Sequence, residues 1–209
     1  SRMGLKLMKN VYIDSLDKRS SISFFADKKE LLYDYDLYQK FIKGCEHTVR
    51  KDDRYTAFIA ELRSNGFNHC AVLGNIPTDD DKIKLEMHHG PIFTLFDVCD
   101  IVVRALFNRG EENITTYKVG DIVLTEHENF NIQVVMLSKT PHTGNHKSNV
   151  FINIKSSIGR VDKFIDKYSD GLQRSHRQHI KRYLDQCKKY KGSLDNGLFD
   201  VAENLTSFK

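Results

Sequence analysis

Two adjacent histidines follow a short apolar segment in the stretch Leu85-Glu86-Met87-His88-His89-Gly90-Pro91. A second apolar segment, Ile132–Leu137, precedes Ser138-Lys139-Thr140-Pro141-His142-Thr143-Gly144-Asn145-His146, which holds two more histidines. Both segments have the length and composition of β-strands, so two strands could bring four imidazoles to one place. Because neutral imidazoles bind transition metals and a bound divalent cation can polarise a phosphodiester, the pattern predicts a split metal site that supports hydrolysis.

The two downstream histidines lie four residues apart. On a helix with Thr140 as its N-cap and Pro141 at its first position, His142 and His146 would lie one above the other. This spacing lets two imidazoles share one ion. Gly144 weakens such a helix, so a turn could present the two side chains instead.

The composition is that of an ordinary globular chain. Its 209 residues, 40% of them hydrophobic, suffice for one sizeable domain or a domain with an appended segment. The net charge of +4 does not by itself argue for a nucleic-acid partner. Because no run of roughly 20 apolar residues and no secretion signal is present, we expect a cytoplasmic protein without a membrane segment. The four scattered cysteines indicate reduced core thiols rather than a disulfide framework.

Hydrophobic periodicity divides the chain into three expected regions. The first, residues 1–80, combines short strands with one long or two short helices over 36–64, where the charged segment 50–54 is a candidate break. The second, residues 81–158, contains both histidine segments and, between them, a buried helix over 93–107 with Thr94 as its N-cap. A strand is also expected over 150–154, whereas residues 114–127 fit a strand or a helix.

The third region, residues 159–209, contains two helical patterns, over 161–168 and 172–190. Basic residues gather on the second pattern with few acids among them, including Arg174, Arg177, Lys181 and Arg182. Such a helix could contact the phosphates of a nucleic-acid backbone without reading its bases. A solvated, charge-rich helix face explains the same pattern equally well.

Around both histidine segments the sequence resembles the HNH, or His-Me finger, nuclease family, in particular its bacteriophage-type members. The resemblance rests on Glu-x-His-His-x-Pro over 86–91, on Val-Val-x-Leu-Ser-x-Thr over 134–140, and on the His-x-x-x-His that follows. It covers residues 85–91 and 132–154. It implies a ββα-metal fold, one divalent metal ion and cleavage of nucleic-acid phosphodiesters.

The resemblance also assigns roles to single residues. It implies that His88 is a metal ligand, that His89 is the general base, and that His142 is the closing ligand. His146 would be a further ligand or a phosphate contact. The asparagine that orients the general base would be Asn131, with Asn129 or Gln133 as substitutes.

Together these observations predict an α+β protein with a ββα-metal-like core elaborated by several helices. Its expected function is metal-dependent endonuclease cleavage, with Mg, Mn, Ni or Zn as the metal and nucleic acid, in the first place DNA, as the substrate. Lys139 and the basic helix would hold flanking phosphates. The alternative is an inactive HNH-like phage protein that keeps a structural metal and binds nucleic acid or a host protein. His127, between two acidic residues, is expected to be solvated.

Overall fold

The computed structural model describes residues 25–28, 33–72, 84–138 and 151–190. In this part of the chain, helices dominate and the strands form two small antiparallel pairs. In chain order the elements are β1 (Phe25–Asp27), α3 (Tyr35–Lys51), α4 (Asp53–Ser64), β2 (Leu85–His89), α5 (Leu95–Asn108), β3 (Asn113–Thr115), α6 (Thr116–Glu128), β4 (Val134–Ser138), α7 (Val161–Lys167) and α8 (Arg174–Lys189), with short 3-10 turns η1 (Ile154–Ser156) and η2 (Ser169–Gly171).

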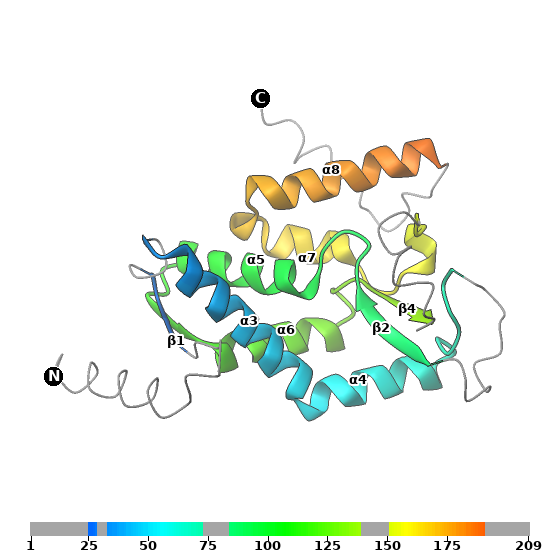
Figure 1. The fold of residues 1–209 in the computed structure, drawn as a ribbon, viewed down its shortest axis with the longest axis horizontal. Coiled ribbons are helices and arrows are strands. Elements are labelled where there is room, and N and C mark those ends of the chain that lie inside the picture. The colour runs from blue at the N-terminus through cyan, green and yellow to red at the C-terminus, as the bar shows by residue number, and fades with distance from the viewer. Residues whose placement is uncertain (1–24, 29–32, 73–83, 139–150, 191–209) are drawn as a thin grey trace, which may run out of the picture.

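Helix α5 lies at the centre of the fold and is buried on nearly every side. Ten of its 14 residues are buried, which confirms the buried helix that the sequence predicts. Its first turn is fixed by a capping box in which Thr94 accepts from Asp97 N–H and the Asp97 carboxylate accepts from Thr94 N–H. Helices α3 and α6 pack against α5, and Figure 1 shows α7 and α8 on its other side.

Turn η2 packs directly on the backbone of α5. A Cβ atom at Gly171 would lie 2.0 Å from the carbonyl oxygen of Ile101, so only glycine permits this close approach. Arg109, just after α5, makes a bidentate ion pair with Asp170 on the same turn. The α5–η2 contact therefore fixes where the chain enters α8.

The two histidine segments begin as predicted, on paired strands. β2 and β4 are antiparallel, and His88 lies opposite Val135 and His89 opposite Val134. The pairing is continuous from Leu85 to His89, without a bulge. The fold is therefore α+β, but a ββα-metal motif is not shown: in the described part of the chain the element that follows β4 is the 3-10 turn η1.

The helical pattern over 36–64 is resolved into two helices at the predicted break. Asp52 caps both, because its backbone N–H donates to Val49 and its carboxylate accepts from Arg54 N–H. The patterns over 161–168 and 172–190 are confirmed as α7 and α8, and the ambiguous segment 114–127 holds the end of β3 and most of α6.

The predicted strand over 150–154 is wrong for its described residues. Residues 151–153 have no regular structure, and Asn153 accepts from Lys155 N–H to cap the 3-10 turn η1. The division at residues 80 and 158 stays a prediction. Among the helices of the described ranges, none is both long and apolar enough to cross a membrane.

Candidate functional site

His89 makes its closest polar contact with His127, the histidine that was expected to be solvated. The two Nε2 atoms are 2.8 Å apart, and His127 Nδ1 lies 2.8 Å from the carbonyl oxygen of Val123. That expectation is wrong because His127 lies on the inner face of α6 and is 1% exposed. Its signal in the sequence is the four-residue spacing of Val119, Val123 and His127, which places them on one helix face.

The hydrogen bonds of this pair fix the protons on both rings. A carbonyl oxygen can only accept, so His127 Nδ1 carries a proton and donates to Val123. In the neutral ring its Nε2 is then an acceptor, and His89 Nε2 must be the donor. The pair is therefore one hydrogen bond between two neutral imidazoles, which joins β2 to α6.

Aromatic side chains of α4 surround the pair. The Tyr55 ring is stacked on His89 at a centroid distance of 6.3 Å, and the Phe58 ring meets His127 edge-on at 5.4 Å. Burial lowers the pKa of His127 to about 4. Burial, followed by the neighbouring His127, holds the pKa of His89 well below its ordinary value. Both rings thus stay neutral near pH 7.

His88 lies on the other face of β2 from His89, as the alternation of an unbulged strand requires. Its Nε2 is 3.7 Å from the Glu86 carboxylate, and both side chains are partly exposed. Lys139, His142 and His146 lie outside the described residues. Within the described ranges, the structure brings no three His, Cys, Asp or Glu side chains together in a way that could hold a metal ion. The metal-ligand assignments stay predictions.

Asn131 is bonded to a carboxylate rather than to a histidine. Its Nδ2 donates to Glu126 at 2.7 Å, and Glu126, 1% exposed, also accepts from the Tyr168 hydroxyl at 2.7 Å and from Lys167. Burial raises the pKa of Glu126, but these hydrogen bonds outweigh it and the pKa is lowered. This network ties α6 to α7, and no hydrogen bond in the described part of the chain joins Asn131 to His89.

A second buried histidine, His176 on α8, contacts the Asp100 carboxylate of α5 at 2.9 Å. His176 Nδ1 accepts from Gln173 N–H, so its Nε2 is the protonated atom that donates to Asp100. Asp100 also accepts from Arg104 Nε at 2.8 Å and from the Tyr38 hydroxyl. Burial raises the pKa of Asp100, yet the bonds from His176, Tyr38 and Arg104 lower it overall. Sequence reasoning missed this network, which joins α3, α5 and α8.

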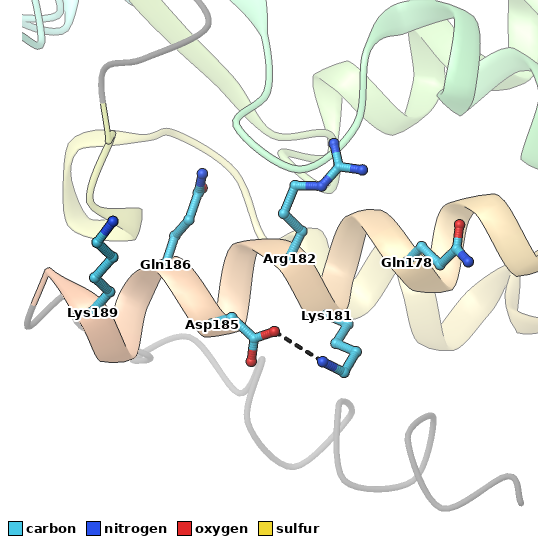
Figure 2. A pocket seen from close by; sticks show the side chains of 6 residues that line it. All are labelled: Gln178, Lys181, Arg182, Asp185, Gln186 and Lys189. Atoms are coloured by element: carbon cyan, nitrogen blue, oxygen red, sulfur yellow. Dashed lines mark hydrogen bonds and ion pairs between the residues drawn. The ribbon is translucent and has the colours of Figure 1, made fainter.

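The four basic residues expected to contact nucleic acid do lie together. Arg174, Arg177, Lys181 and Arg182 are all on α8, and each is exposed except Arg177, which is partly buried. Lys181 is paired with Asp185 at 2.9 Å. Figure 2 shows the outer side chains of α8, with Arg182, Gln186 and Lys189 extending to one side and Lys181 and Asp185 to the other.

Comparison with known families identifies the family of the chain. The sequence model of the bacteriophage G278-like virion proteins matches residues 7–207. The chain belongs to this virion protein family. Neither the curated proteins nor the solved structures contain a match.

Membership of the virion protein family corrects the nuclease interpretation. The HNH resemblance rested on residues 85–91 and 132–154, whereas the virion match spans nearly the whole chain and no HNH family matches. The metal-dependent endonuclease, its enzyme class and the inactive HNH-like alternative are therefore wrong, and only the bacteriophage association is supported. The family match implies a virion location rather than the expected cytoplasmic one.

Proposed function

We propose that this chain is a structural component of a bacteriophage particle, which it joins through contacts with other particle components. The observation that carries the proposal is the family match over residues 7–207, which leaves little of the chain for a separate catalytic module. The proposal concerns assembly, so the test must ask whether the protein belongs to the finished particle.

The interior of the described fold supports a structural role. Several titratable side chains of this interior connect elements to each other: His89 and His127 join β2 to α6, Glu126 joins α6 to α7, and Asp100 and His176 join α5 to α8. Each is engaged by hydrogen bonds within the fold. These contacts favour a rigid building unit over a site that must exchange substrate.

The experiment is to purify particles of the phage that encodes the chain on a density gradient and to quantify the protein by mass spectrometry. We expect it to sediment with the major particle proteins at a constant ratio through a high-salt wash. A non-structural phage protein from the same lysate is the control. Recovery only at the top of the gradient, together with that control, would contradict the proposal.

A second measurement tests for metal-dependent nuclease activity, which the family match does not support. Supercoiled plasmid incubated with the purified protein and Mg²⁺, Mn²⁺, Ni²⁺ or Zn²⁺ should remain intact. Nicking that co-purifies with the protein through two chromatographic steps would show that a purely structural role is wrong.

A further inference from the structure

We propose that the outer face of α8 binds the phosphate backbone of nucleic acid inside the particle. This inference rests on the proposed function, because it assigns a partner to a particle component. The charge of the chain is distributed very unevenly along the sequence.

Helix α8 holds the charge excess of the whole protein. It carries six of the 32 basic residues and one of the 28 acidic ones, whereas the net charge of the chain is only +4. The remainder of the chain is thus nearly neutral. A positive field of this kind attracts polyanions to one place on the surface.

Burial of the inner side leaves most of these charges on the outer half of the helix. The residues of α8 that turn inward are His176, Ile180, Tyr183, Leu184 and Cys187. At 100° per residue, five of the six basic positions fall on the half of the helix away from these residues: Arg174, Lys181, Arg182, Lys188 and Lys189. Arg177 lies at the edge of this half, next to Leu184, and is partly buried.

Most of these charges are not neutralised by the fold. Lys181 pairs with Asp185, the one acidic residue of the helix. No ion pair joins Arg174, Arg182 or Lys188 to a carboxylate in the described part of the chain. Arg174, Arg182 and Lys188 therefore present positive charge that a polyanion could contact.

The composition of the face favours nucleic acid over an acidic protein surface. From Arg174 to Lys189, every fully exposed side chain of α8 is charged, hydroxyl or amide. Protein interfaces are built around buried aromatic or aliphatic anchors, which this face lacks. Contacts to phosphates, by contrast, are made by Arg, Lys, Ser and Gln, the residue types present here.

The dimensions also fit a backbone contact. Sixteen residues of helix are about 24 Å long, which equals the axial length of about seven base pairs of duplex DNA. The outward basic side chains of α8 can therefore meet several phosphates of the backbone. Because phosphates carry no sequence information, we expect binding without base preference.

The test measures binding of the full chain to a labelled 30-base-pair duplex DNA by fluorescence anisotropy, in about 0.1 to 0.3 M salt. The α8 variant is R174Q/R182Q/K188Q/K189Q. The matched control, K40Q/K43Q/K51Q/K163Q, removes the same charge from exposed positions on α3 and α7. Far-UV circular dichroism and the melting temperature establish that both variants fold. A third variant, R174K/R182K, keeps the charge while changing the side chains.

We expect the α8 variant to bind at least about tenfold more weakly, and its slope of log affinity against log salt to fall by up to about 3.6, since each of the four lost phosphate contacts contributes about 0.9. The control and the R174K/R182K variant should stay within about threefold of the wild type. Single-stranded DNA and RNA of the same length, run in parallel, identify which nucleic acid is preferred.

Three results would overturn the inference: unchanged binding by the α8 variant, an equal loss in the control, or equally tight binding of polyglutamate. Particle association, measured separately, distinguishes this failure from failure of the proposed function. A protein that is present in particles but does not bind nucleic acid removes only the α8 inference. A protein that binds DNA but is absent from particles removes the proposed function.

Discussion

Two buried histidine sites stabilise this fold in different ways. His127 meets another neutral imidazole among aromatic rings, and burial lowers its pKa to about 4. His176 meets the Asp100 carboxylate, which Arg104 and Tyr38 also contact. His127 therefore pairs with a neutral ring, whereas His176 donates to an anion that Tyr38 and Arg104 also contact. The comparison shows that a histidine's neighbour, rather than the histidine itself, sets how a contact responds to substitution.

The largest effect is expected at the carboxylate of the second site. Asp100→Ala should lower the free energy of unfolding by about 4 kcal/mol, because removing one member of a buried charged network leaves the other members without an acceptor. Urea denaturation of the variant and of wild type measures the difference. A loss below about 1 kcal/mol would mean that α8 does not depend on Asp100 for its position.

Acid should destabilise the fold through the His89–His127 pair. His127 has a folded pKa of about 4 against an ordinary value of 6.5, so below pH 6.5 the unfolded chain binds a proton that the folded chain does not. The contribution of His127 to the free energy of unfolding is therefore constant above pH 6.5. It falls as the pH drops from 6.5 toward 4. The loss from His127 is about 3 kcal/mol in total, and His89 acts in the same direction.

This pH dependence is measured by urea denaturation at several pH values. The slope between pH 6.5 and 5 should be clearly smaller in His127→Ala than in wild type. Equal slopes in the two proteins would assign the acid sensitivity to other groups.

Removing the imidazole itself should cost less than removing the carboxylate. His127→Ala is expected to lower the free energy of unfolding by about 2 to 3 kcal/mol, since it opens a cavity beside Phe58 and leaves the His89 N–H without its acceptor. Thermal and urea unfolding report the change. His47→Ala, at an exposed position of α3, is the matched control and should change stability by less than about 0.5 kcal/mol.

The smallest effect is expected on the solvent side of α8. Asp185→Ala breaks an ion pair with Lys181 between two side chains that are 55% and 67% exposed. Such pairs contribute about 0.5 kcal/mol or less, so the melting temperature should barely move. A large drop in that temperature would show that the outer face of α8 supports the fold as much as its inner face does.

Local patterns in the sequence predicted most of the secondary structure. The apolar run over 93–107 with Thr94 before it, and the charged break near Asp52, predicted α5 and the α3–α4 junction, because these signals come from neighbouring residues. The contact between His89 and His127 could not be predicted in the same way. These residues are 38 positions apart, and only the packing of α6 against β2 and α4 brings them together.

The nuclease interpretation of the histidine motif was wrong for a related reason. His88-His89 and His142 lie on segments that match a nuclease pattern, but a short pattern does not show what each imidazole contacts. In the fold, His88 and His89 lie on opposite faces of β2, and His89 contacts a histidine on α6. The basic cluster of α8 was more predictable, because one helix carries all of its residues.

The central claim is that the His89–His127 pair serves the fold of a particle protein as a neutral hydrogen bond. Nitrogen-15 NMR of the histidine side chains across pH 7.5 to 5 tests it most directly. Both rings should stay neutral over this range, with the proton on Nδ1 of His127 and on Nε2 of His89. Titration of His89 near its ordinary pKa, or rapid exchange between tautomers at either ring, would contradict it.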